Sequence, residues 1–128
     1  MTDLFLKRIL LLDAASCLGM GALLAIVAGP LTGLFGIDLA ILRGAGLLLL
    51  PIGLFIGWTA LRPVLRPLPI WLVIAGNLLW TAESFVLIAS NAGITGLGQA
   101  FVAAQALMVA ALTLLETAGV LKIAAAKA

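Results

Sequence analysis

The 128-residue sequence contains no histidine and no tyrosine, a single cysteine, and only 9% charged residues. Without histidine there is no imidazole to hold haem or zinc or to act as a general base. The lone Cys17 excludes an internal disulfide and a metal site made of several cysteines, and we expect it to pack as a small apolar side chain. No arrangement of catalytic residues is recognisable. We therefore predict a protein that is not an enzyme and that has no cofactor and no bound metal.

Charge of either sign is also scarce. Seven lysines and arginines stand against five acidic residues, which gives a formal net charge of +2. The basic residues are dispersed and form no stripe with interleaved aromatic residues, which is the pattern of a nucleic-acid-binding surface. Nucleic acid is therefore excluded as a partner.

Long apolar runs account for most of the chain. Hydrophobic residues make up 65% of it, and the mean hydropathy is +1.34. A helix needs about 20 apolar residues to cross a bilayer. Four runs approach or exceed that length, at residues 9–34, 44–61, 68–90 and 97–123. Backbone amides in lipid must bond within their own segment, and these runs lack the alternation of a barrel strand. The sequence predicts an all-α fold: a transmembrane four-helix bundle forming a single domain over residues 1–128.

Basic residues outside the runs predict the orientation. If the N-terminus is inside, the inner side collects six of them: Lys7, Arg8, Arg62, Arg66, Lys122 and Lys127. The outer side then has Arg43 alone. Because cytoplasmic loops are enriched in Lys and Arg, we expect both termini in the cytoplasm and the protein in a bacterial inner membrane. Asp13 interrupts the apolar run, so the first segment is expected to be a retained helix rather than a cleaved signal peptide.

The segments between the runs differ in character. Residues 29–33, which include Gly-Pro, are expected to break the first helix, and residues 35–42 to form a short amphipathic stretch in the outer interface. Residues 62–69 contain three prolines and are expected to be extended. Residues 91–98 carry three glycines and no charge, as in a tight turn. Little of the chain is therefore expected outside the membrane.

Small residues recur at helical spacing in the first two runs. Gly46, Gly53 and Gly57 project from one face of the second helix. A similar stripe on the first helix consists of Ala14, Gly21, Ala25 and Ala28. Because small side chains let helix backbones approach closely in lipid, these positions are expected to pack helices together. The contact is either between the first and second helices of one chain or between two copies of the chain.

Polar residues inside the spans indicate a candidate intramembrane site. Asn77, Trp80 and Ser84 share one face of the third helix. Glu83 lies off that face, at the same depth as Gln105 on the fourth helix. Because no basic residue lies at this depth, Glu83 is expected to be protonated and bonded to Gln105 or a hydroxyl, or to face a water-filled cavity. The candidate site therefore comprises Glu83, Asn77, Trp80, Ser84 and Gln105.

Two further acidic residues fall closer to the predicted cytoplasmic boundary. Asp13 and Glu116 each lie within about two helical turns of it, at 1.5 Å per residue. Lys7 and Arg8 lie near the first, and Lys122 lies near the second. We expect both carboxylates to reach the interface or to pair with these cations.

Several segments carry a resemblance to a known group of proteins. They are residues 43–51 (RGAGLLLLP), Arg62-Pro63, Asn77 to Trp80 with Ser84, and residues 100–106 (AFVAAQA). In these segments the chain resembles small bacterial four-span integral membrane proteins of uncharacterised function. That group usually has an apolar residue at the position of Glu83. The resemblance implies a four-span membrane fold and no particular activity.

The function favoured by these observations is that of a non-enzymatic bacterial inner-membrane protein, either an accessory or assembly partner or a small self-associating bundle. Its partners would be the lipid bilayer, other membrane proteins or further copies of itself, met through helix faces. The alternative is a small oligomeric transporter or permeation unit that uses Glu83, Asn77 and Gln105. A water-accessible cavity at Glu83 would favour this alternative.

Overall fold

The computed structural model describes residues 2–127, and the side chains of residues 3–125. This part of the chain forms four helices: α1 (Thr2–Phe35), α2 (Leu39–Ala60), α3 (Pro67–Ser90) and α4 (Gly96–Lys127). All four are long and apolar enough to cross a membrane. The predicted all-α class is thus confirmed, and so are four helices of membrane-spanning length and composition, because hydropathy and helical periodicity are local properties of the sequence.

The helix ends differ from the apolar runs. α1 begins at Thr2 rather than near residue 9, and α4 continues to Lys127. A charged side chain ends an apolar run without ending a helix, so both helices extend beyond the runs. Residues 35–42, expected to form a short amphipathic stretch, comprise the last residue of α1, a turn and the start of α2. Phe35, Ile37 and Leu42 are buried in the bundle, whereas Leu39 and Ile41 are exposed.

The Gly-Pro sequence bends the first helix instead of breaking it. Pro30 has no N–H to donate to the carbonyl of Ile26, and its ring crowds that carbonyl. The strain appears at Val27, where φ is −106° and ψ is 16°. Beyond this kink the helix resumes, and Thr32 Oγ1 donates to the carbonyl of Ala28 at 3.1 Å. The last turns of α1 are therefore redirected but remain helical.

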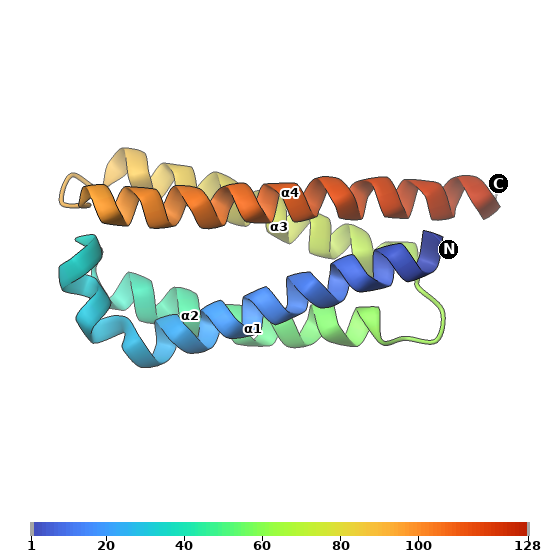
Figure 1. The fold of residues 1–128 in the computed structure, drawn as a ribbon, viewed down its shortest axis with the longest axis horizontal. Helices are drawn as coiled ribbons and strands as arrows, with labels where there is room; N and C mark the ends of the chain where they lie inside the picture. The colour runs from blue at the N-terminus through green and yellow to red at the C-terminus, as the bar shows by residue number, and fades with distance from the viewer. Residues whose placement is uncertain (1, 128) are drawn as a thin grey trace.

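The redirected end of α1 closes one end of the bundle. It rises from the layer of α1 and α2 toward the loop between α3 and α4 (Figure 1). Thr95 donates to it twice, from its backbone N to the carbonyl of Phe35 at 2.9 Å and from Oγ1 to that of Leu34 at 2.7 Å. Phe35 stacks on Phe101 of α4 with ring centroids 4.6 Å apart. Gly36 turns the chain at a φ of 66°, which glycine adopts without strain.

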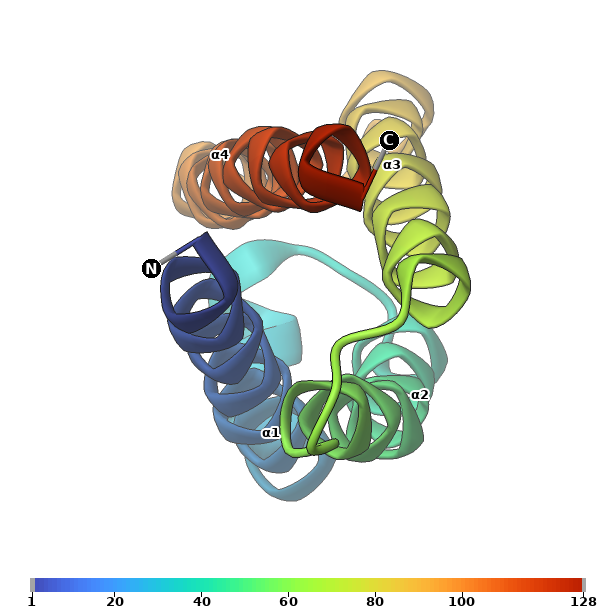
Figure 2. The same ribbon diagram turned by 90° about the vertical axis from the view of Figure 1, so that its right-hand side faces the viewer.

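The helices pack unevenly around the axis of the bundle (Figure 2). α1 packs along α2 and against α4, and α3 packs along α4, but α2 and α3 make few contacts. Residues 61–66 link α2 to α3 at the end opposite the closed one. α1 begins and α4 ends at that same end, as an even number of helices running the length of the bundle requires (Figure 1). The bundle is thus tightly joined on three sides and loosely joined between α2 and α3.

Glycines set the close contact of α2 with α1. A Cβ on Gly46 would lie 2.5 Å from the Ala25 nitrogen and 2.8 Å from the Gly21 carbonyl oxygen. A Cβ on Gly53 would lie 2.8 Å from Leu18 Cγ, whereas one on Gly57 would meet only Ala14 Cβ at 3.7 Å. This face was expected to pack either against the first helix of the same chain or against a second copy of the chain. In the structure it packs against α1 of the same chain. Gly46 and Gly53 are required to be small, and Gly57 has room for a methyl group.

Candidate functional site

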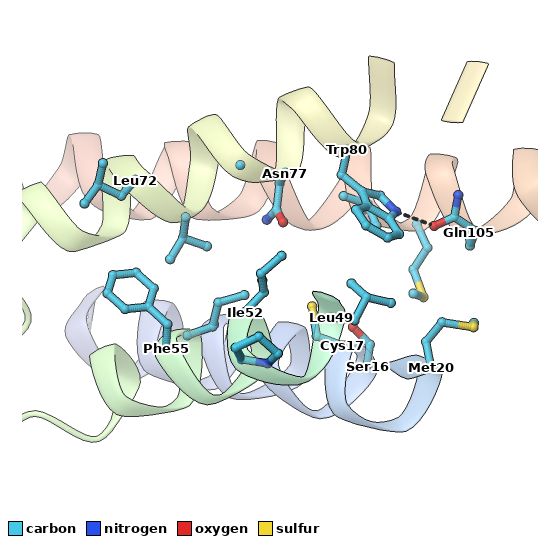
Figure 3. Close-up of a pocket in the computed structure, with 16 residues that line it drawn as sticks. Ser16, Cys17, Met20, Leu49, Ile52, Phe55, Leu72, Asn77, Trp80 and Gln105 are labelled. Atoms are coloured by element: carbon cyan, nitrogen blue, oxygen red, sulfur yellow. Dashed lines mark hydrogen bonds between the residues drawn. The ribbon is translucent and has the colours of Figure 1, made fainter. Parts of the chain in front are cut away.

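A cavity of about 320 Å³ lies inside the bundle, with walls contributed by all four helices (Figure 3). Most of its wall is apolar, as at Leu49, Ile52 and Val73. Polar side chains enter from three helices: Ser16 from α1, Asn77 from α3 and Gln105 from α4. Small-molecule sites in proteins have volumes of about 300–1,000 Å³ and the same mixture of an apolar wall with a few polar groups.

The cavity reaches the surface where α2 and α3 are loosely joined. Four of the five exposed residues that line it belong to these helices, Pro51 and Phe55 to α2 and Leu72 and Gly76 to α3, and the fifth is Met108 of α4. Both helices are of membrane-spanning length and composition, so in a bilayer this side of the bundle would face acyl chains rather than water. The opening would then be lateral, toward the lipid.

A hydrogen-bond network lies along one polar edge of the cavity. Trp80 Nε1 donates to Gln105 Oε1 at 2.9 Å (Figure 3). Gln105 Nε2 donates to Ser84 Oγ and to the carbonyl of Val102, both at 2.9 Å, and Ser84 Oγ donates to the carbonyl of Trp80 at 2.8 Å. Three of the predicted site residues thus form one network that joins α3 to α4.

A second network surrounds Asn77, which also lines the cavity. Asn77 Nδ2 donates to Asp13 Oδ2 at 2.8 Å and to Glu116 Oε1 at 3.0 Å. Cys17 Sγ donates to Asp13 Oδ1 at 3.7 Å. Asp13 is 1% exposed and Glu116 is fully buried. One amide therefore bridges two buried carboxyls from α1 and α4.

This arrangement corrects the expectation that Asp13 and Glu116 reach the cytoplasmic interface or pair with cations. Among the described side chains their hydrogen-bond partners are Asn77 and Cys17, and neither is basic. The depth estimate failed because both helices extend past the apolar runs. Each carboxyl lies eleven residues from the nearer end of its helix, or about 16 Å at 1.5 Å per residue.

The burial of these two carboxyls could have been predicted from the sequence. Asp13 shares a helix face with the buried Leu6 and Leu10, and Glu116 with the buried Leu112 and Val120. Acidic residues at positions that complete an apolar face are typical of buried, hydrogen-bonded groups. Two carboxylates beside one amide, with no basic side chain among their partners, would repel each other strongly if both were ionised.

Glu83 is not part of either network. It is exposed on α3 and does not line the cavity. The expected hydrogen bond to Gln105 is wrong, because the amide of Gln105 is directed to Trp80, Ser84 and Val102. Successive residues of a helix are rotated by about 100° about its axis. Glu83 therefore points away from the face that carries Asn77, Trp80 and Ser84, toward the outside of the bundle.

The described residues contain no group of three or more aspartate, glutamate or cysteine side chains placed to hold a metal ion. Comparison with protein families, curated proteins and solved structures found no match to this chain. The resemblance to small four-span membrane proteins therefore stays a prediction, and the site is interpreted from its own geometry.

Proposed function

We propose that this chain is a non-enzymatic multi-pass membrane protein that binds one lipophilic molecule, taken from the bilayer, in its central cavity. The observation that carries the proposal is the cavity itself, which lies open where α2 and α3 are loosely joined and has polar groups set into an apolar wall. An apolar molecule already dissolved in the membrane reaches such an opening without crossing water.

The cavity volume limits the size of the occupant. Water occupies about 30 Å³ per molecule in the liquid, and an apolar protein cavity of about 150 Å³ takes up benzene. A volume of about 320 Å³ therefore suits roughly ten to twelve non-hydrogen atoms. That is the size of a medium-length alkyl chain with a small head group. The polar side chains then fix its orientation, as they do in most ligand sites.

Binding from the bilayer is compatible with the accessory role expected from the sequence, with lipid and its dissolved molecules as the first partner. The transporter alternative retains Asn77 and Gln105, which line the cavity, but not Glu83. The end of the bundle closed by α1 favours lateral exchange over passage through the bundle, since Phe35 and Thr95 lie across that end.

Filling the cavity mouth is expected to abolish binding. A Cβ on Gly76 meets nothing within 4 Å, so Gly76→Phe places a ring at the mouth without a backbone clash. The probe is 10-bromodecan-1-ol, whose bromine quenches indole fluorescence, with Trp58→Phe and Trp71→Phe leaving Trp80 as the only tryptophan. We expect saturable quenching of Trp80 in lipid nanodiscs. In Gly76→Phe, half-maximal quenching should require at least a tenfold higher probe concentration.

The matched control is Gly19→Phe. Gly19 is also an exposed helical glycine with nothing within 4 Å of a built Cβ, but it does not line the cavity. This variant should bind the probe like the parent. Quenching that rises linearly with probe and is equal in all three proteins would show partition into lipid alone, and the proposal would then be wrong.

The proposal includes the orientation, with both termini in the cytoplasm of a bacterial inner membrane. Support comes from the six basic residues on one side against Arg43 on the other. In a Cys17→Ala background, a membrane-impermeant maleimide added to intact cells should label Asn91→Cys and leave Ala128→Cys unlabelled. After cell disruption both should react. Labelling of Ala128→Cys in intact cells would reverse the topology.

A further inference from the structure

The polar side chains that line the cavity have their hydrogen-bond donors already engaged. Trp80 Nε1 donates to Gln105 Oε1. The amide of Gln105 uses its two hydrogens on Ser84 and Val102, and that of Asn77 uses its two on Asp13 and Glu116. The last two donors belong to α1. Ser16 Oγ donates to the Asp13 carbonyl at 2.8 Å, and Cys17 Sγ donates to the Asp13 carboxyl.

Acceptors, in contrast, remain free to meet an occupant. Among the described residues, Asn77 Oδ1 receives no hydrogen bond, while its nitrogen serves two carboxyl oxygens. If the amide were rotated by 180°, its oxygen would face the two carboxyl oxygens, and acceptor would meet acceptor. The carboxyls therefore fix the nitrogen toward themselves and Oδ1 away from them. Asp13 and Glu116 are thus positioning residues that leave Oδ1 as the unused polar atom of a side chain lining the cavity (Figure 3).

From this imbalance we propose that the cavity selects neutral lipophiles whose head group donates a hydrogen bond, such as a medium-chain alcohol. This inference rests on the proposed function and names the ligand class of the same site. A hydroxyl gains Asn77 Oδ1 as an acceptor. An ether or ester oxygen finds no free donor there and loses its hydrogen bonds to water on entering. A carboxylate would in addition lie close to the buried pair of carboxyls.

Two probes of matched length test the selection on the unaltered site. They are 10-bromodecan-1-ol and its isomer 1-bromo-9-methoxynonane, which differ in that the second has no hydrogen-bond donor. With Trp80 as the only tryptophan, and with each concentration expressed as a mole fraction in lipid, we expect the alcohol to reach half-saturation at about one tenth of the ether concentration.

A variant without the acceptor gives the second readout. Asp13→Ala/Asn77→Leu/Glu116→Leu replaces the two carboxyls and the amide that bridges them with apolar side chains. We expect both probes to reach half-saturation on this variant at the higher mole fraction that the ether requires on the parent chain. If this variant does not fold, the comparison of the two probes on the parent chain still decides the question.

The outcomes separate the two proposals. Saturable binding of both probes at the same mole fraction overturns the donor selection and leaves the cavity as a ligand site. Failure of both probes to saturate overturns the cavity proposal and the selection with it. A tenfold preference that survives in the triple variant also overturns the assignment, because the preference then does not arise at Asn77.

Discussion

Replacing Asn77 by leucine is expected to destabilise the bundle by about 3–5 kcal/mol, because two buried carboxyls lose their shared amide donor at once. Asp13 and Glu116 lie at 1% and 0% exposure, so water cannot take its place. Glu116 Oε2 already has no hydrogen-bond partner among the described residues, and the loss of Asn77 would leave Oε1 in the same condition. The free energy of unfolding is measured in detergent by SDS titration, followed by circular dichroism.

The triple variant Asp13→Ala/Asn77→Leu/Glu116→Leu is the matched comparison. Removing all three polar groups together leaves no carboxyl unpaired, and buried ionic networks replaced in this way are often as stable as the original. We expect it to recover most of the stability that Asn77→Leu loses. If the single variant were as stable as the parent, the carboxyls would have another partner and the bridge described here would be incorrect.

The second large effect is expected at the contact between α1 and α2. Gly46→Ala places a methyl group 2.5 Å from the Ala25 nitrogen and 2.8 Å from the Gly21 carbonyl oxygen. Both are backbone atoms, so the two helices must move apart. The expected cost is about 3 kcal/mol, at the upper end for an overpacked core. Thermal unfolding in detergent measures it as a lower melting temperature.

Gly44→Ala is the control on the same helix. A Cβ there meets nothing within 4 Å, so the substitution brings no clash and improves helix propensity by about 0.5–1 kcal/mol. The two variants should therefore shift the melting temperature in opposite directions. Equal shifts would mean that the α1–α2 contact is looser than the structure shows.

The network around Asn77 relates stability to the proposed binding. Asn77 donates hydrogen bonds to Asp13 and Glu116 and also lines the cavity. Polar groups are costly within a membrane and usually serve a function. A bundle of this size could pack these positions with leucine, so their presence beside a cavity supports a role in recognising an occupant.

Much of this protein follows from sequence alone. The four long apolar helices were predictable because the hydropathy of about 20 consecutive residues determines whether a helix is stable in lipid. The small face of α2 at Gly46 and Gly53 and the polar face of α3 at Asn77, Trp80 and Ser84 were also predictable. These are properties of one helix, and its periodicity assigns residues to faces without any knowledge of the neighbours.

Only the tertiary structure decided which faces meet. Asn77 brings together Asp13 and Glu116, which are 103 positions apart, and no pattern within α1 or α4 predicts that encounter. The rotation of α3 about its axis places Ser84 inside and Glu83 outside, although the two are adjacent. The lateral opening depends on the loose contact of α2 with α3. Helix rotation and spacing are set by side chains from all four helices at once, so no single segment of the sequence contains them.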